Sequence, residues 1–382
     1  MLFADETIIQ TGGRMSKKVS SAIVLVLFVF SSFASGAQSL TSSDKYFVAS
    51  GSYDPLEVNA NITLNKKPLC IAVNDETNRV YVGVEGGLVV INGETYEVIA
   101  EIPLDANVVT LAVNTRTNRI YAGIYGKNVT VIDGTTNLKV GAILEALYRP
   151  YSLAVNPSTN RVYISDEASF MGEYDRVKVY NGENLALVTS VNIPESNTYT
   201  KLATVGIAVN PKINRIYASW SGNNTLHMID GATNEVIKTV SVSTSIELVM
   251  VNSYTNYVYT GVTVLNGETL AEVTTDGRLQ EVQAIDHIHN LIFTTHWTTR
   301  TLSVFNGTTH VLVDSLKLSW VIYAFRDPIA VNSKTSMVYV VNSQASEVAV
   351  IPEFPVLTPI LLALFVLAVA ILVQSARFKK KH

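Results

Sequence analysis

A single sequence unit recurs seven times between residues 72 and 339, and this repeat constrains the fold more than any other feature. Each copy opens with two apolar residues followed by Asn or Asp, and an aromatic residue stands seven positions later. Successive copies are 40, 42, 54, 42, 34 and 46 residues apart. The Asn and Asp positions are Asn74, Asn114, Asn156, Asn210, Asn252, Asp286 and Asn332, and the aromatic positions are Tyr81, Tyr121, Tyr163, Tyr217, Tyr259, Phe293 and Tyr339. Repeats of about 40–50 residues predict stacked copies of one supersecondary unit.

Two turn signals divide each copy. The side chain of the leading Asn or Asp can close an Asx turn, and four residues later a second Asn, or Ser336 in the last copy, can take the left-handed conformation. The second signal is an Asx-Gly pair in the first six copies, such as Asn92-Gly93. Between apolar runs this pair predicts a type I′ hairpin turn with positive φ at both central residues. Each copy therefore predicts four consecutive antiparallel strands.

Four-stranded units at this spacing are typical of a β-propeller, and strands such as Arg79-Val80-Tyr81-Val82 suit sheets that are covered on both faces. The predicted fold class is all-β, a seven-bladed propeller of four-stranded antiparallel blades. The last copy ends at Ile351 without a fourth strand. Residues 56–64 can supply that strand and so close the ring. A pair of β-sandwiches and a β-solenoid are the alternatives, and two hairpin turns per copy disfavour the solenoid.

The repeats also carry a family resemblance. The run Asn114-Thr115-Arg116-Thr117-Asn118-Arg119-Ile120-Tyr121 resembles the unit of YVTN-repeat β-propellers in archaeal surface-layer and related cell-envelope proteins. The resemblance extends over residues 57–351, with the largest departures at Met250, Asp286 and Ser336. It implies a propeller in the cell envelope. It selects no activity, because such relatives include both envelope proteins and lactonase-like enzymes.

The N-terminus has the pattern of a secretory signal. Lys17 and Lys18 precede an apolar run at residues 22–30, and small residues follow up to Ala37. The run is shorter than the roughly 20 residues of a membrane-spanning helix. We predict a signal peptide region at residues 1–37, with Met15 as the true start and cleavage before Gln38. A retained N-terminal anchor is the alternative.

The C-terminal segment, residues 352–382, has the pattern of a membrane anchor. Pro352-Glu353-Phe354-Pro355 precedes an uncharged apolar stretch at 356–373, and basic residues follow it. This stretch is long enough to form a transmembrane helix, and the positive-inside rule keeps the basic tail in the cytoplasm. The segment also resembles the archaeal PEF-type sorting signal, which implies cleavage and a lipid anchor. In both cases the predicted propeller, residues 38–351, would lie on the outer surface of the cell.

One face of the predicted ring offers a recognition surface. Both turns of each copy fall on the opposite face, so the loops that vary most in length gather on this one. Exposed aromatic and Arg side chains are typical of recognition surfaces. The candidate ligand-face residues are Arg149, Tyr174, Trp220, Trp297, Arg300, Trp320, Tyr323 and Arg326. The alternative is that these residues plug the channel or cover the ends of the blades.

A loop in the third copy is the first candidate for metal binding. It contains the carboxylates of Asp166, Glu167, Glu173 and Asp175. Oxygen ligands suit calcium, but the spacing does not match a calcium-loop motif. A solvated acidic loop is therefore favoured over a calcium site.

Asp286, His287 and His289 are the second candidate, because imidazole and carboxylate suit a transition metal. These residues align with the first turn of the other copies. An ordinary hairpin turn is therefore favoured here.

The composition excludes several classes of protein. Lys and Arg total 28 against 32 for Asp and Glu, so no basic surface for nucleic acid is expected. The single cysteine, Cys70, rules out a disulfide framework, and its apolar neighbours predict a buried side chain. The chain contains no HExxH, GxSxG, P-loop or GxGxxG motif. Propeller enzymes can assemble a site from scattered residues, so an enzyme is disfavoured but not excluded.

We therefore predict a non-enzymatic cell-surface module, with a recognition or structural role, that binds other envelope proteins or glycans and needs no cofactor. The alternative is an extracellular lactonase-like or other hydrolase that uses the variable-loop face. The ionisable residues available to such a site are Arg149, Glu167, Asp175 and His296. Sequons at Asn61, Asn128 and Asn223 are candidate glycosylation sites in a secreted chain.

Overall fold

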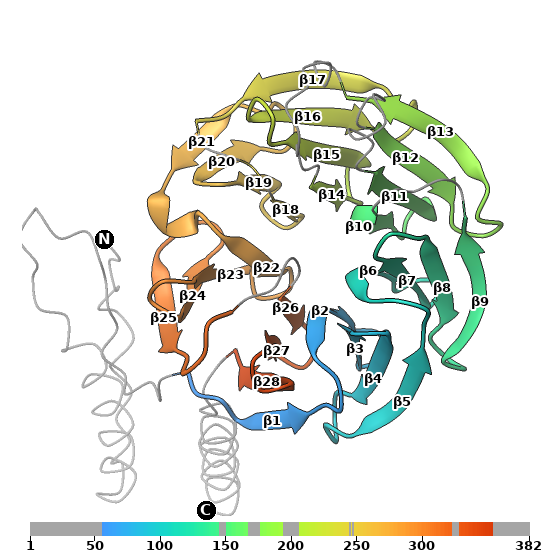
Figure 1. Ribbon diagram of the computed structural model, residues 1–382. Coiled ribbons are helices and arrows are strands. Elements are labelled where there is room, and N and C mark those ends of the chain that lie inside the picture. Colours follow the sequence, from blue (N-terminus) through green and yellow to red (C-terminus); the bar gives the residue numbers. More distant parts are fainter. Residues whose placement is uncertain are drawn as a thin grey trace, which may run out of the picture. The chain divides into compact units, whose positions relative to one another are not determined.

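The computed structural model describes residues 56–144, 150–166, 176–193, 206–243, 246, 248–322 and 328–353. Within this part of the chain, 28 strands form seven four-stranded antiparallel sheets arranged as the blades of a ring (Figure 1). The innermost strand of each blade contacts the innermost strands of both neighbouring blades, so the ring is closed. The predicted all-β, seven-bladed propeller is confirmed.

Each of the first six blades runs outward from the channel in chain order. Blades 1 and 2 comprise β2 (Pro68–Asn74), β3 (Arg79–Val84), β4 (Gly87–Asn92), β5 (Val98–Pro103), β6 (Val108–Asn114), β7 (Arg119–Ile124), β8 (Val129–Asp133) and β9 (Leu138–Ile143). Blades 3 and 4 comprise β10 (Pro150–Asn156), β11 (Arg161–Asp166), β12 (Arg176–Asn181), β13 (Leu187–Asn192), β14 (Ile207–Asn210), β15 (Arg215–Trp220), β16 (Thr225–Asp230) and β17 (Val236–Ser241). Blades 5 and 6 comprise β18 (Val249–Asn252), β19 (Tyr257–Thr260), β20 (Thr263–Asn266), β21 (Glu272–Thr275), β22 (Val282–Asp286), β23 (Leu291–His296), β24 (Thr301–Asn306) and β25 (Leu312–Lys317), with the short 3-10 helix η2 (Gly277–Leu279) between them.

Blade 7 combines the two ends of the described chain. It contains β26 (Ile329–Asn332), β27 (Met337–Asn342), β28 (Glu347–Pro352) and, as its outer strand, β1 (Ala60–Thr63). β1 pairs antiparallel with β28, with Ala60 opposite Val350 and Thr63 opposite Glu347; Figure 1 shows the blue β1 beside the red β28. The segment 56–64 therefore supplies the strand that the last sequence repeat lacks, and the pairing covers the edge of β28 and closes the ring.

The core lies between the blades. In the described residues, each pair of neighbouring sheets encloses its own cluster of buried apolar side chains, for example around Ile120 between blades 1 and 2 and around Val338 between blades 6 and 7. Cys70 is fully buried in one of these clusters, as its neighbours predict. Burial on both faces explains why inner strands such as β3 and β4 are nearly continuous apolar runs.

The first turn of each copy has the predicted geometry. Asn74 Oδ1 accepts the backbone N–H of Glu76 at 3.1 Å, and the closing residue Asn78 has φ of 49°. Ser336, which closes the turn in blade 7, has φ of 54°. Asn and Asp tolerate this left-handed region better than other residues with side chains, which explains their recurrence.

The prediction of type I′ turns at the Asx-Gly pairs is wrong. Asn92 Oδ1 caps the N–H of Glu94 at 3.0 Å, and the positive φ falls on Tyr96 instead of on Asn92 or Gly93. Glycine recurs in this pair for another reason. A Cβ built on Gly93 would lie 2.1 Å from Oδ1 of Asn78, so the position admits glycine because a neighbouring side chain fills the space.

The predicted signal peptide region at 1–37 and the predicted transmembrane helix at 356–373 lie outside the described residues, so both remain predictions. Among the residues that are described, no helix is both long and apolar enough to cross a membrane.

Candidate functional site

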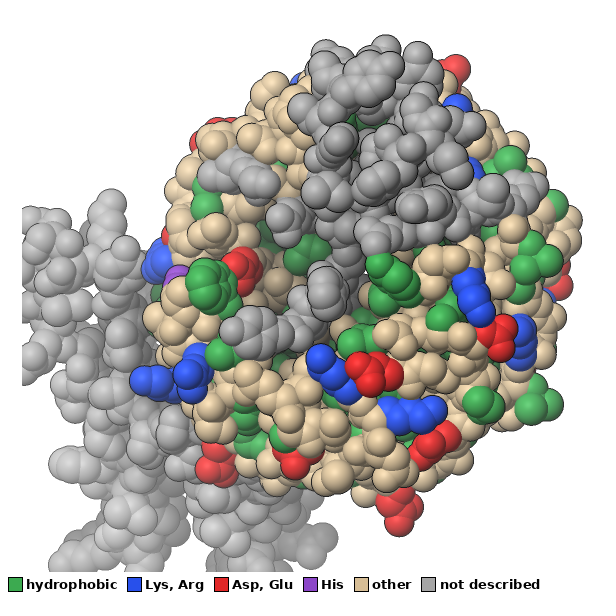
Figure 2. Space-filling view, in the orientation of Figure 1, with side chains coloured by type: hydrophobic (Ala, Val, Ile, Leu, Met, Phe, Trp, Pro, Cys, Tyr) green, Lys and Arg blue, Asp and Glu red, His purple; other side chains and the backbone are tan. Residues whose placement is uncertain are grey.

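The ring has two faces with different contents. We call the face that carries the two turns of each blade the turn face, and the face with the loops between second and third strands and between blades the connection face. Figure 2 shows acidic and basic side chains interspersed over the described part of the face that it draws. Charges of mixed sign do not attract a partner of uniform charge, so recognition there depends on individual side chains.

Half of the predicted ligand face lies outside the described residues. The residues concerned are Arg149, Tyr174, Tyr323 and Arg326. Of the predicted acidic loop, Glu167, Glu173 and Asp175 also lie outside, and Asp166 ends β11 without a described side chain. The structure therefore tests neither the favoured solvated loop nor the calcium alternative, and this half of the surface remains a prediction.

The prediction that Trp220 belongs to the ligand face is wrong. The residue is 1% exposed and packs in the core between blades 3 and 4. Side chains alternate along a strand, so Trp220 follows Ile216 and Ala218 on the side of β15 that faces blade 3. Sequence position placed Trp220 at the end of a strand but could not show which way the ring points.

Trp297 and Arg300 are exposed on the connection face, in the turn between β23 and β24. The Trp297 side chain is 58% exposed. Arg300 is exposed, and its Nη1 donates to the backbone oxygen of Ser319 at 3.3 Å. A shallow depression of about 590 Å³ beside this turn is lined by Thr298, Thr299, Arg300, Lys317, Leu318 and Ser319. Trp297 therefore belongs to the same turn as three residues that line a hollow with hydroxyl and cationic groups.

Trp320 and His296 have more structural roles. Trp320 is half-buried and packs against the core between blades 6 and 7. His296 is exposed at the end of β23, where its Nδ1 lies 2.9 Å from the Thr298 hydroxyl within the same turn. Of the four ionisable residues considered for a hydrolase site, only His296 lies among the described residues, so the structure does not test their convergence.

The outer strands expose apolar side chains on six blades. Leu138 and Val140 on β9 and Val313 on β25 are examples, each more than half exposed. On β1, the outer strand of blade 7, the candidate glycosylation site Asn61 is exposed instead. Asn223 is also exposed, in the turn after β15, whereas Asn128 is half-buried. Glycosylation of these three residues remains a prediction.

Six of the seven blade junctions carry the same hydrogen bond on the turn face. The Asn that ends an inner strand donates through Nδ2 to Oδ1 of the Asn that closes the first turn of the next blade, at 2.7–2.9 Å. The pairs are Asn74–Asn118, Asn114–Asn160, Asn156–Asn214, Asn210–Asn256, Asn252–Asn290 and Asn332–Asn78. Buried amides are stable only when such partners are present. The two repeated Asn positions therefore connect the blades as well as forming turns.

Two further residue types belong to these junctions. The glycine after the third strand packs directly on the closing Asn, and its N–H donates to that residue's backbone oxygen, as Gly182 does to Asn160 at 2.8 Å. At four of these junctions the repeated tyrosine also donates to the same glycine from the preceding blade, as Tyr121 Oη does to the Gly182 oxygen at 3.2 Å.

The junction between blades 6 and 7 departs from this pattern at each of these positions. Asp286 replaces the donor Asn, Ser336 the acceptor Asn, and Phe293 the tyrosine. Glu353 occupies the glycine position, since its N–H donates to the Ser336 oxygen at 2.8 Å as glycine does elsewhere. Because serine is small, the Glu353 side chain can enter the space that an Asn side chain fills in the other six junctions.

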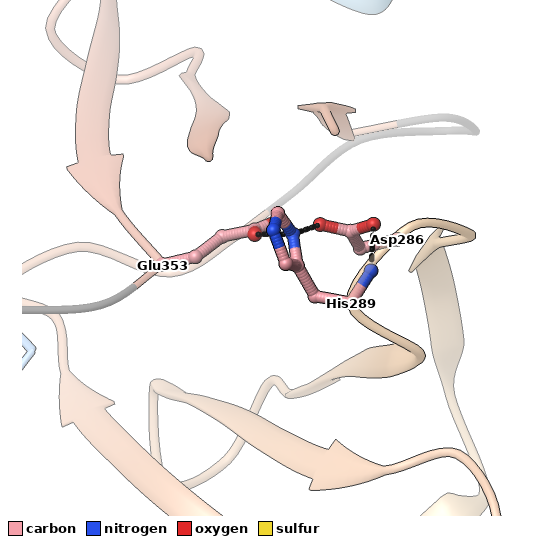
Figure 3. Close-up of side chains that lie close together, drawn as sticks. All are labelled: Asp286, His289 and Glu353. Carbon is pink, nitrogen blue, oxygen red and sulfur yellow. Dashed lines mark hydrogen bonds and ion pairs between the residues drawn. The ribbon is translucent and has the colours of Figure 1, made fainter. Parts of the chain in front are cut away.

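Glu353 meets Asp286 and His289 in that space, and we call these three residues the junction cluster (Figure 3). His289 Nδ1 lies 2.7 Å from Asp286 Oδ2 and 3.3 Å from Glu353 Oε2. Both carboxyl side chains are fully buried, whereas the His289 side chain is 34% exposed. Asp286 Oδ1 also accepts the backbone N–H groups of Ile288 and His289, at 2.7 and 2.9 Å. The residues come from the β22–β23 turn of blade 6 and the end of β28 in blade 7.

The two carboxyl groups of the cluster have opposite pKa shifts. Burial raises the pKa of Glu353, and a hydrogen bond to the Asp286 carboxylate and its charge raise it further, to about 10. Burial acts to raise the pKa of Asp286 too, but hydrogen bonds from Glu353, His289 and Ile288 outweigh it and lower that pKa. At neutral pH, Glu353 therefore holds a proton and donates it to a charged Asp286. This acid–carboxylate hydrogen bond takes the place of the amide link.

Glu353 was missed by sequence reasoning, which assigned it to the C-terminal anchor segment. The alignment of Pro352-Glu353 with the Asx-Gly pairs could have indicated its role. A large residue at the glycine position fits only where a residue smaller than Asn closes the first turn, and Ser336 is such a residue. For Asp286 and His289, the predicted hairpin turn is confirmed, but the turn also brings both side chains to Glu353.

Comparisons with known proteins show the fold alone. No protein-family model matches the chain, and no curated protein matches it either. Among solved structures, the β-propeller domain of Cps50 (Swd1) from Myceliophteria thermophila is similar, with a TM-score of 0.63 and 12% sequence identity. The match covers 78% of this chain and 99% of that domain. The similarity supports the β-propeller fold.

Proposed function

We propose that the chain is a non-enzymatic, membrane-tethered propeller of the cell envelope that binds an envelope protein or glycan through its connection face. The exposed Trp297 beside Arg300 and the polar depression carries this proposal. Aromatic and Arg side chains dominate the energetics of recognition surfaces, and here two paired strands of a closed ring hold the turn that carries them. The signal and anchor patterns at the two ends, and the YVTN-type and PEF-type resemblances, support a position outside the cell.

Saturable binding to native envelope fragments tests the proposal. The purified full chain is mixed with fragments and the bound fraction is measured by co-sedimentation over a range of concentrations. Trp297→Ala should weaken binding at least tenfold, because an exposed aromatic anchor contributes on the order of 2 kcal/mol. Tyr254→Ala is the matched control, since Tyr254 is a 62% exposed aromatic residue in a turn of the opposite face. We expect this variant to bind like the unmodified chain.

Two outcomes would contradict the proposal. Absence of saturable binding would remove the recognition role as stated. Equal weakening by Trp297→Ala and Tyr254→Ala would show that the connection face has no special part in it.

A further inference from the structure

We infer that the junction cluster is a binding site for one divalent transition-metal ion, held by Asp286, His289 and Glu353 between blades 6 and 7. An imidazole with two carboxylates favours Zn²⁺, Mn²⁺, Fe²⁺ or Co²⁺ over calcium, which takes oxygen ligands. The site is separate from the connection face, and it does not depend on the proposed binding function.

The ligand atoms already converge. One donor atom from each of the three residues lies within 4.8 Å of the other two, and in Figure 3 the His289 ring lies between the two carboxyl groups. A tetrahedral ion with bonds of about 2.0–2.1 Å separates its ligand atoms by roughly 3.3 Å. The distance of 3.3 Å between His289 Nδ1 and Glu353 Oε2 has this value, and the 2.7 Å contact with Asp286 needs only a small side-chain rotation.

Glu353 provides an independent reason to expect a ligand. Its side chain is fully buried and points into the cluster, and apart from the 3.3 Å contact with His289, neither carboxyl oxygen accepts a hydrogen bond from a described residue. Buried carboxyl oxygens without donors are costly. A cation between the two carboxyl groups would displace the proton of Glu353 to solvent, satisfy the oxygens of Glu353 and balance the two negative charges that result. The partly exposed His289 ring leaves a solvent-facing side through which the ion can enter and a water can complete the coordination.

The local sequence change supports the same conclusion. At the position of His289, five of the other six copies have threonine. Asp286, His289, Ser336 and Glu353 therefore all differ from the repeat at one junction, and the side chains they introduce are metal ligands or make room for one. The ion would tie the first turn of blade 6 to the last strand of blade 7, and so fix the blade that closes the ring.

The full chain, purified without a histidine tag and dialysed against a chelator, tests this inference. Zn²⁺ is titrated calorimetrically, and Co²⁺ is added separately because its visible absorption reports nitrogen and oxygen coordination. We expect one ion per chain and a higher melting temperature with Zn²⁺. His289→Thr, which introduces the residue of the other blades, should weaken binding at least 100-fold and abolish the thermal shift.

His287→Ala is the control, because His287 is exposed in the same turn and is not part of the cluster. Glu353→Gln keeps the shape of the side chain while removing its charge, so it tests the carboxylate without emptying the space; it should also weaken binding at least 100-fold. The inference is overturned if the unmodified chain binds no stoichiometric ion, if His289→Thr and Glu353→Gln bind as the unmodified chain does, or if His287→Ala loses binding as His289→Thr does.

Discussion

Six junctions of this propeller are joined by an amide pair, and the seventh is joined by a carboxyl pair with a histidine. At the junction of blades 2 and 3, Asn114 donates to Asn160 at 2.9 Å, and Gly182 leaves room for the acceptor. At the junction of blades 6 and 7, Glu353 fills that room and meets Asp286. The backbone bond that supports each arrangement is the same, at 2.8 Å in both.

The comparison teaches that one backbone geometry supports two chemistries. The amide link has no titratable group, so its strength is independent of pH over the physiological range. The carboxyl link depends on one proton or, as we infer, on one metal ion. Of the seven junctions, the one between blades 6 and 7 is thus the one that responds to solution conditions.

Introducing Glu, the residue of blade 7, at the glycine position of an amide-linked junction should have the largest effect on stability. Gly182→Glu introduces a side chain whose Cβ would lie 2.3 Å from Asn160 Oδ1, which overpacks the site and breaks the amide link. We expect a loss of about 3 kcal/mol in the free energy of unfolding, measured by urea titration. Adding Asn160→Ser, which copies the small residue of blade 7, should recover part of the loss. If Gly182→Glu alone were as stable as the unmodified chain, the conclusion that a Glu at the glycine position needs a residue smaller than Asn beside it would be refuted.

Removing the donor of one amide link should have the next largest effect. Asn114→Ala leaves Oδ1 of Asn160 without its donor and removes the cap on Arg116 N–H. The expected loss is about 2 kcal/mol in the same urea titration, because a buried polar atom is left unpaired. Lys139→Ala, at an exposed position on the outer strand of the same blade, is the control and should change the free energy of unfolding little. Equal stability of Asn114→Ala and the unmodified chain would mean that the amide links contribute nothing.

The carboxyl junction should make stability depend on pH in the metal-free protein. The pKa of Glu353 is raised to about 10 in the folded state from an ordinary value near 4.5, so the folded state binds more protons than the unfolded state between these values. The free energy of unfolding should therefore fall as the pH rises from about 5 toward 10, by at most about 1.4 kcal/mol per unit from this group. Urea titrations with a chelator between pH 6 and pH 9 measure the slope. Glu353→Gln should flatten it, and an unchanged slope would contradict the assigned proton.

A smaller effect of opposite sign is expected from blade 4. Burial lowers the pKa of His227 to about 4, and its ring lies between the hydroxyls of Thr225 and Thr239 at 3.0 and 2.9 Å. The unfolded state binds the proton more readily, so stability should fall as the pH drops below about 6.5. His227→Gln should reduce this loss by about 1 kcal/mol at pH 5.5, as read from thermal unfolding. If the acid dependence were identical in the variant, His227 would not be its source.

The fold could be predicted because the repeat determines strands and turns locally. The offset of seven residues from Asn to the aromatic position fixes one hairpin, and the spacing of the copies fixes the blade. The contacts across junctions could not be predicted in this way. Asn74 and Asn118 belong to different copies, and their hydrogen bond exists only once the ring is closed.

The direction in which an individual side chain points could not be predicted from the sequence either. Trp220 and Trp297 both stand at the ends of second strands, yet one ring is buried between blades and the other is exposed. Glu353 lies outside the repeat and beside an anchor signal, so its place in blade 7 appears only through the backbone bond to Ser336.

The most direct measurement compares the unmodified chain with a variant that carries Asp286→Asn, His289→Thr, Ser336→Asn and Glu353→Gly, the residues typical of the other junctions. The free energy of unfolding is measured by urea titration at pH 6 and pH 8.5 in the presence of a chelator. We predict that the variant folds with an amide link at the seventh junction and loses the fall in stability between these pH values. A variant that keeps the full pH dependence of the unmodified chain would contradict the conclusion that the junction cluster is a titratable replacement for that link.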